Sequence, residues 1–142
     1  MADGAFLIMK MRSTVLLAGG VLALAAAPAF AHHSFAAEYD STKPVTLQGA
    51  VTKMEWSNPH ARFYVDVRDP AGTVSNWEFE LASPNGLMRR GWNRNSLKPG
   101  DNVIVEGYRA KDGSKLVNAR NVTLGDGRKI FAGSADDGGP GK

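Results

Sequence analysis

The sequence contains no cysteine and only three histidines in its 142 residues. Without cysteine there can be no disulfide bond and no thiolate metal site, so a packed core must stabilise the fold. Long apolar runs are also few. The longest, Val15–Ala27, is shorter than the ~20 residues that cross a bilayer, and we therefore predict no membrane span.

Excess charge of either sign is small. The whole chain carries a formal net charge of +3. Removal of residues 1–31 takes away Lys10, Arg12 and Asp3, which leaves fifteen basic and thirteen acidic side chains. This balance gives no indication of a nucleic-acid or anionic-lipid ligand.

The N-terminal segment has the organisation of a secretory signal peptide. Lys10 and Arg12 supply a basic start, an apolar centre follows, and small residues at Ala29 and Ala31 precede the expected cleavage point. We therefore predict a soluble protein that is exported to the periplasm and whose mature chain begins at His32. Because acidic and apolar residues precede the basic start, Met9 or Met11 is the better candidate for the true translation start.

Short apolar segments with period-two alternation dominate the rest of the chain, and this pattern predicts β-strands. In the first segment the apolar parity changes near Thr52–Lys53, as a β-bulge would cause. Ser83 and Pro84 then provide the cap and first position of a short helix. The predicted strands are Val45–Trp56, Arg62–Arg68, Val74–Leu81, Asn102–Tyr108 and Leu116–Leu124.

Three strands, a short helix and two more strands follow the element order of the five-stranded Greek-key barrel called the OB-fold. We predict this mainly β fold, with the helix between strands three and four; a small open β-sandwich is the alternative. The predicted division of the chain is a signal peptide at 1–31, an N-terminal arm at 32–44, a barrel domain at 45–131 and a disordered tail at 132–142.

The expected cleavage exposes a histidine pair, His32 and His33. An N-terminal histidine offers its α-amine and one ring nitrogen to a metal ion, and such nitrogen ligands favour Cu(II). His33 could instead chelate through its ring, its amide and the terminal amine. The alternative is that both rings are solvated on a terminal segment and have no function.

His60 is the third histidine, and it lies in the loop Trp56-Ser57-Asn58-Pro59-His60. Residues 34–43 could extend roughly 30 Å, which would allow His32 to meet it. We predict His60 as a third metal ligand; the alternative is a turn histidine that is hydrogen-bonded to nearby backbone.

The aromatic residues of strands two and three are placed for a core. Phe63, Trp77 and Phe79 fall on the inward phase, whereas Glu78 and Glu80 fall on the outward phase. Outward carboxylates would repel phosphates, so we predict no nucleic-acid ligand on this face.

Candidate partner-binding residues are basic or amphipathic. Tyr64 and Arg62 lie on the outward phase of strand two, and Arg89, Arg90 and Arg94 form the densest basic cluster. These arginines could hold an anionic ligand or an acidic patch on a partner. Alternatively, they form a solvated face that pairs with the strand carboxylates.

Catalytic signatures are missing from the sequence. The serines lack a nucleophile-elbow or triad context, and Gly125–Lys129 is a turn rather than a phosphate-binding loop. The carboxylates are scattered along strands and turns. We therefore predict a protein that is not an enzyme, with a copper-dependent enzyme as a remote alternative.

Several motifs together resemble a bacterial family of small exported proteins of unknown function. They are H-H-S-F from His32, W-S-N-P-H from Trp56, S-P-N-G-L from Ser83 and R-R-G-W from Arg89. The resemblance implies a periplasmic, mainly β domain and brings no activity or site residues. A weaker similarity, in topology only, is to periplasmic bacterial OB-fold stress proteins.

These observations lead to one functional hypothesis and one alternative. We expect a non-catalytic periplasmic module that binds copper through His32, with His33 or His60 completing the site. The alternative is an envelope protein-interaction or stress-related module without metal, which would bind a protein or small ligand through Tyr64 and the arginines.

Overall fold

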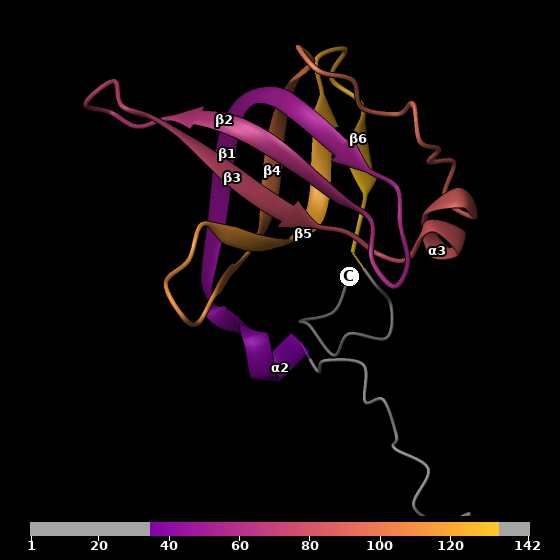
Figure 1. Cartoon of the computed structure of the whole chain (residues 1–142), viewed down its shortest axis with the longest axis horizontal. Coiled ribbons are helices and arrows are strands. Elements are labelled where there is room, and N and C mark those ends of the chain that lie inside the picture. Colours follow the sequence, from indigo (N-terminus) through magenta and orange to yellow (C-terminus); the bar gives the residue numbers. More distant parts are fainter. Residues whose placement is uncertain (1–34, 134–142) are drawn as a thin grey trace, which may run out of the picture. The chain divides into compact units, whose positions relative to one another are not determined.

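The computed structural model describes residues 35–133, and within them the chain is mainly β, as predicted. Each of two short helices precedes a run of three strands in this part of the chain (Figure 1). In chain order they are α2 (Phe35–Glu38), β1 (Tyr39–Glu55), β2 (Arg62–Arg68), β3 (Val74–Glu80), α3 (Pro84–Met88), β4 (Asn102–Ala110), β5 (Leu116–Leu124) and β6 (Lys129–Phe131).

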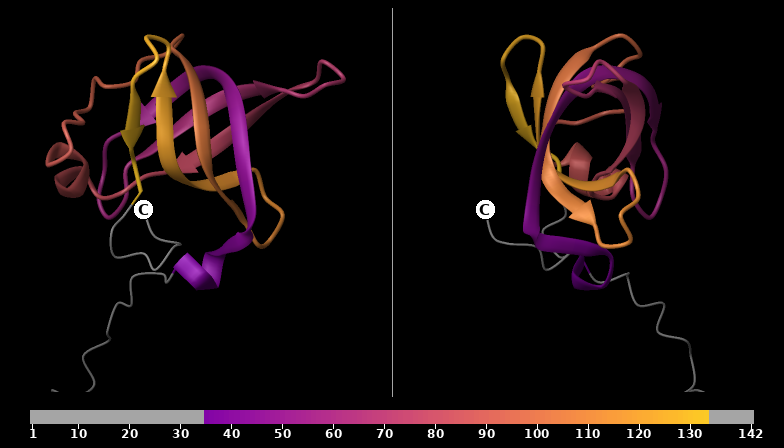
Figure 2. Two further views of the ribbon diagram at one scale, coloured as in Figure 1. Left: turned by 180° about the vertical axis from the view of Figure 1, so that it is seen from behind. Right: turned by 90° about the vertical axis from the view of Figure 1, so that its left-hand side faces the viewer.

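The strands form one sheet in the order β3-β2-β1-β4-β5-β6. A further, parallel pairing joins β3 to β5, whereas all the other pairings are antiparallel. The pairings of β1 to β5 therefore return to their starting point, and β6 is added beside β5. Figure 2 shows how these strands curve around a common interior.

Strand β1 is long enough to pair with β4 along its first part and with β2 along its last part. Its register against β2 shifts between Val51 and Lys53, which confirms the predicted bulge. Val45, Leu47 and Val51 face the core before the bulge, and Met54 packs against it afterwards. One extra residue thus lets a single strand serve two sides of the sheet.

The core is built from the predicted inward residues. Phe63 and Phe79 are fully buried, and their rings stack with centroids 5.0 Å apart. The predicted cap of α3 is confirmed, because the Ser83 side chain accepts a hydrogen bond from the Gly86 backbone N–H at 3.3 Å. This short helix buries Leu87, and Trp92 follows it into the core.

Two features at the ends of the described chain differ from the predicted elements. Strand β1 begins at Tyr39 rather than Val45, and α2 precedes it, because Phe35 and Tyr39 pack with Ala110 into a second small apolar cluster. Strand β6 was not predicted. It pairs with β5, and the Ala132 backbone N–H then donates to the Arg120 carbonyl at 2.8 Å.

Several predictions concern residues outside the described range. The signal peptide, the histidine pair His32 and His33, and residues 134–142 of the predicted tail all lie there. Within residues 35–133, no helix is long and apolar enough to cross a membrane.

Candidate functional site

His60 is half-buried in the loop between β1 and β2 and is held in one orientation by the end of β3. Its Nδ1 lies 3.0 Å from the Leu81 carbonyl oxygen. Because a carbonyl can only accept a hydrogen bond, Nδ1 must carry the proton in this contact. This contact directs Nε2 away from the Leu81 carbonyl, and a backbone carbonyl on one ring nitrogen is the arrangement that an ordered histidine ligand adopts in metal sites.

A complete metal site is not present among the residues that the structure describes. No group of three His, Asp or Glu side chains in this part of the chain is arranged to hold a metal ion. Of the three predicted ligands, only His60 can be placed, since His32 and His33 precede the described residues. The backbone hydrogen bond expected for a turn histidine is therefore observed, and a metal ligand role stays a prediction.

The chain that leads from the histidine pair is anchored close to β3. Phe35 and Tyr39 are both 3% exposed, and the Phe35 ring meets the Tyr108 ring edge-on at 5.5 Å. The Tyr39 hydroxyl lies beside the Glu80 carboxylate. Glu80 directly precedes Leu81, whose carbonyl holds His60. The start of the described chain and His60 thus contact adjacent residues, namely Glu80 at the end of β3 and Leu81 directly after it.

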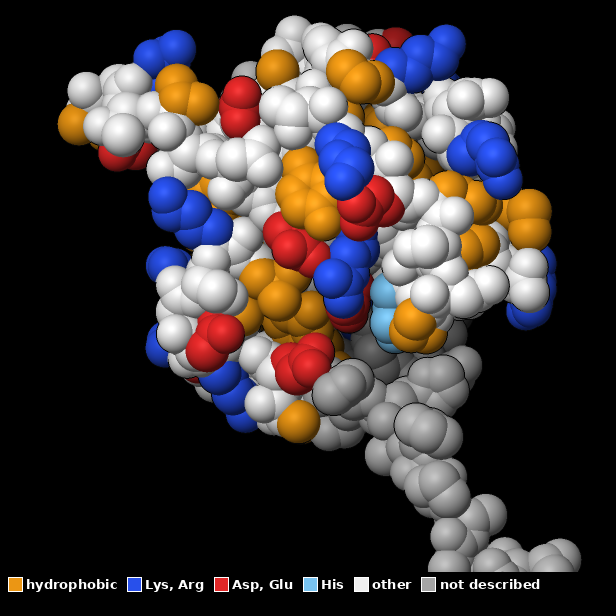
Figure 3. All heavy atoms as spheres, viewed as in Figure 1, with side chains coloured by type: hydrophobic (Ala, Val, Ile, Leu, Met, Phe, Trp, Pro, Cys, Tyr) orange, Lys and Arg blue, Asp and Glu red, His pale blue; other side chains and the backbone are white. Residues whose placement is uncertain are grey.

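A network of charged groups crosses the outer face of β2 and β3. The Arg62 guanidinium lies 2.8 Å from a Glu78 carboxylate oxygen and 3.4 Å from a Glu80 oxygen. Burial opposes the charge on Arg62, but the two carboxylates outweigh it and raise the pKa of this guanidinium. Figure 3 shows acidic and basic side chains alternating over this face.

Glu80 corrects the prediction that both strand carboxylates are exposed. Glu80 is only 7% exposed, because Tyr39, at the start of β1, covers it. Burial, followed by the Glu80 and Glu38 carboxylates, raises the pKa of the Tyr39 phenol far above its ordinary value. The hydroxyl touches Glu80 without a well-formed hydrogen bond. Asn118, paired with Glu80 across β3 and β5, is also buried, and its Oδ1 has no hydrogen-bond partner.

Tyr64 is less available to a partner than the sequence indicated. Its hydroxyl donates to Glu55 Oε2 at 3.1 Å, and the Lys53 ammonium lies 5.4 Å from its ring centroid. Burial, then the nearby Glu78 carboxylate and the hydrogen bond to Glu55, raise the pKa of this phenol. Arg62 is likewise engaged by two carboxylates, so both strand-two candidates have structural partners.

The predicted arginine cluster divides into two kinds of side chain. Arg90 donates from Nη1 to the Gly133 carbonyl at 2.7 Å, and its guanidinium lies 4.7 Å from the Phe131 ring centroid. Arg90 thus anchors residues 131–133. Arg89 and Arg94 are exposed and form no ion pair within the described residues. The expected pairing of this cluster with Glu78 or Glu80 is therefore wrong, because Arg62 occupies both carboxylates.

The aromatic residues of β2 and β3 offer no row of exposed rings. Phe63 and Phe79 are fully buried, and Trp77 is half-buried with the Arg109 guanidinium 5.3 Å from its ring centroid. This arrangement agrees with the core role that the inward phase predicted.

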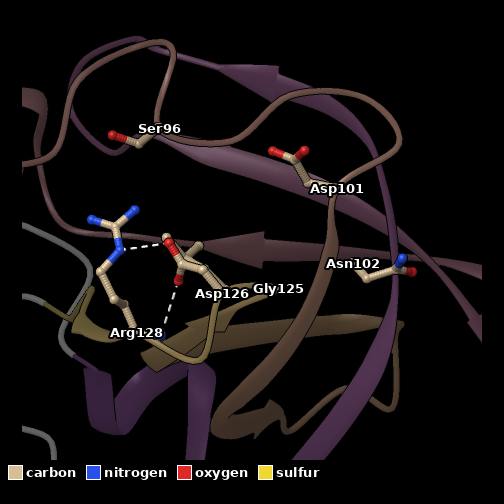
Figure 4. Close-up of a pocket in the computed structure, with 7 residues that line it drawn as sticks. Ser96, Asp101, Asn102, Gly125, Asp126 and Arg128 are labelled. Atoms are coloured by element: carbon tan, nitrogen blue, oxygen red, sulfur yellow. Dashed lines mark hydrogen bonds and ion pairs between the residues drawn. The ribbon is translucent and has the colours of Figure 1, made fainter.

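A polar pocket of about 260 Å³ lies between the loop before β4 and the β5–β6 turn (Figure 4). This pocket was not predicted, since its walls come from two turns that are distant along the chain. Its charged groups are satisfied locally: Arg128 Nε lies 2.7 Å from Asp126 Oδ2, and Asp101 Oδ2 accepts from the Lys98 N–H at 2.8 Å. All four of these residues are exposed, so the pocket is a weaker candidate than the His60 region.

Comparison with known proteins adds a family but no activity. Residues 19–118, more than half of the chain, match a family described as a family of unknown function, DUF6152. No curated protein matches the chain.

Proposed function

The chain belongs to the DUF6152 family, whose function is unknown, and we propose that it acts as a non-catalytic binding module exported to the periplasm. Its ligand in this proposal is a copper ion held by the α-amine and ring of His32 after signal-peptide cleavage. His60 or His33 supplies a further nitrogen. The observation that carries the proposal is the orientation of His60, whose Nδ1 is tied to Leu81 and whose Nε2 is left to bind a metal.

The scaffold that we propose is an OB-fold barrel. Two observations support it: the strand pairings run in a circuit through β1, β2, β3, β5 and β4, and α3 lies between β3 and β4. In such a barrel, the ends of strands and their loops carry the ligand site. His60 and the anchored segment at Phe35–Tyr39 both lie against the end of β3, which is consistent with a site there.

The site has only to coordinate the metal ion, and no covalent bond of a substrate is made or broken. Amine and imidazole nitrogens suit Cu(II), and copper affinity generally exceeds that of the other divalent first-row metals for such a set. Because the α-amine must be deprotonated to bind, affinity should fall as the pH is lowered. This ligand set depends on cleavage directly before His32.

Calorimetric titration of Cu(II) into the processed protein tests this proposal. We expect the mature chain to bind one copper ion at least about tenfold more tightly than the same chain with its α-amine acetylated, because acetylation removes the amine from the chelate without adding a residue. The His60→Gln variant should also bind more weakly, whereas Asn58→Ala, in the same loop, should bind as the mature chain does. Equal affinity of the free and acetylated chains would exclude the His32 chelate.

A second candidate function, an envelope protein-interaction module, is supported by one observation. Met88 is 52% exposed at the end of α3 and directly precedes Arg89, and neither Arg89 nor Arg94 forms an ion pair within residues 35–133. An exposed apolar side chain followed by a guanidinium group without an ion pair suits an acidic partner surface. Substitution of both arginines by glutamate should abolish a crosslink to such a partner, while Lys98→Glu should not. A crosslink that survives the double substitution would contradict this role.

A further inference from the structure

A concentration of uncompensated positive charge lies on the hairpin between β4 and β5. Arg109, Lys111 and Lys115 occupy this hairpin, and none of them forms an ion pair within residues 35–133. We call these three residues the hairpin basic surface. Figure 3 shows Lys and Arg side chains along the left margin of the molecule, over the region where Figure 1 draws this hairpin.

Each cation of the hairpin basic surface contacts a neutral group instead of a carboxylate. Arg109 donates from Nη2 to the Gly113 carbonyl at 3.1 Å. Lys111 donates to the Ala36 carbonyl at 2.5 Å, and Lys115 donates to the Ser75 hydroxyl at 2.8 Å. These contacts hold the side chains in place and leave their full charge for a ligand.

The acidic groups near the hairpin do not cancel this charge. Asp112, on the hairpin itself, uses Oδ1 to accept the Ser114 backbone N–H at 2.8 Å. Glu78 pairs with the hairpin through its backbone, but its carboxylate is held by Arg62. Glu38, on α2, accepts the Lys111 backbone N–H through its carbonyl, and none of the three carboxylates forms an ion pair with Arg109, Lys111 or Lys115 among the described residues.

Arg109 is held in a fixed orientation. Its guanidinium stacks on the Trp77 ring, 5.3 Å from the ring centroid, and its Nη2 donates to the Gly113 carbonyl. Its Nε is buried and has no hydrogen-bond partner, so this atom does not itself reach a surface ligand. The charge of the guanidinium stays at the hairpin in a fixed plane, which suits a phosphate oxygen.

We propose that the hairpin basic surface binds an extended polyanion whose charges are phosphate groups. An extended ligand is favoured over a single ion because the contacts of the hairpin run from Ser75 on β3 to Ala36 on α2. Three cations spread over this span can each meet a separate phosphate. This function is independent of copper and uses different residues.

Binding of long-chain inorganic polyphosphate to the full processed chain, measured at several salt concentrations with EDTA present, tests the proposal. The Lys111→Gln/Lys115→Gln double variant should bind at least about tenfold more weakly, and its slope of log affinity against log salt should be about two smaller. Both lysines are exposed, so the variant should keep the wild-type melting temperature. Arg109→Lys keeps the charge but loses the planar guanidinium that stacks on Trp77, and it should also bind more weakly.

The control is Lys98→Gln, which removes one positive charge from an exposed turn elsewhere, against two in the hairpin double variant. It should leave the affinity and the salt slope unchanged. An equal loss in Lys98→Gln, or unchanged binding in the hairpin double variant, would overturn the proposal. So would orthophosphate binding as tightly as polyphosphate, or vesicles of phosphatidylglycerol being bound where polyphosphate is not. Retained polyphosphate binding in His60→Gln would separate this result from the copper site.

Discussion

At the scale of single residues, the position of Glu80 shows what the sequence could not reveal. The alternation of β3 placed this carboxylate on the outer face correctly, but the outer face there is covered by Tyr39 from another element. A buried carboxylate needs compensation, and Arg62 provides it. The orientation of His60 was equally hidden, because it depends on a carbonyl that is distant along the chain. Period-two patterns predict which face a side chain occupies, but not what later packs on that face.

The difference between the two strand carboxylates leads to a stability prediction. Glu80→Ala would remove one of the two carboxylates that pair with Arg62 and would leave a gap beside the buried Tyr39 hydroxyl, so the free energy of unfolding should fall by about 2–3 kcal/mol. Glu78→Ala removes a carboxylate that is 28% exposed, and its cost should stay below about 1 kcal/mol. Urea denaturation of both variants measures this difference. Equal losses would show that burial of Glu80 has no energetic consequence.

The raised pKa of Tyr39 predicts how stability depends on alkaline pH. The folded chain keeps the phenol protonated above its ordinary pKa of 10.0, whereas the unfolded chain releases the proton there. This contribution is therefore fully present below about pH 10 and is lost progressively as the pH rises further. Above pH 10 the free energy of unfolding should fall more steeply for the wild type than for Tyr39→Phe. Parallel curves would contradict the assigned environment.

At the scale of secondary-structure elements, the long and strongly patterned segments were predictable. The bounds of β2 and β5 are confirmed as predicted, and so is the bulge in β1. The short elements α2 and β6 were not predicted, because four or three residues carry too little pattern to indicate an element. Their stability comes from tertiary contacts: α2 from Phe35 against Tyr108, and β6 from its pairing with β5.

The packing of α2 predicts a large cost for one truncation. Phe35→Ala should lower the free energy of unfolding by about 2–4 kcal/mol, since the ring is buried against two tyrosines. Met88→Ala, at a position that is 52% exposed, should change it by less than about 0.5 kcal/mol. Thermal or urea unfolding distinguishes the two. A Phe35→Ala chain as stable as Met88→Ala would mean that α2 does not dock.

At the scale of the whole molecule, the proposed functions use different residues. His60 lies in the loop between β1 and β2, Arg89 and Arg94 follow α3, and the hairpin basic surface lies between β4 and β5 and contacts α2 through Lys111. A module of this kind could hold a metal ion and a polyanion at the same time. The net charge of the chain is only +3, so the excess of positive charge on the β4–β5 hairpin reflects where the basic residues lie in the fold and not the total charge.

The central claim is that cleavage creates a copper chelate at His32 and that His60 contributes to it. Electron paramagnetic resonance of one equivalent of Cu(II) on the exported chain, with its first residue confirmed by intact mass, tests this claim most directly. The account predicts an ordered nitrogen-coordinated spectrum that changes in His60→Gln and is lost when the α-amine of His32 is acetylated. A spectrum that is identical with the free and the acetylated amine would contradict it.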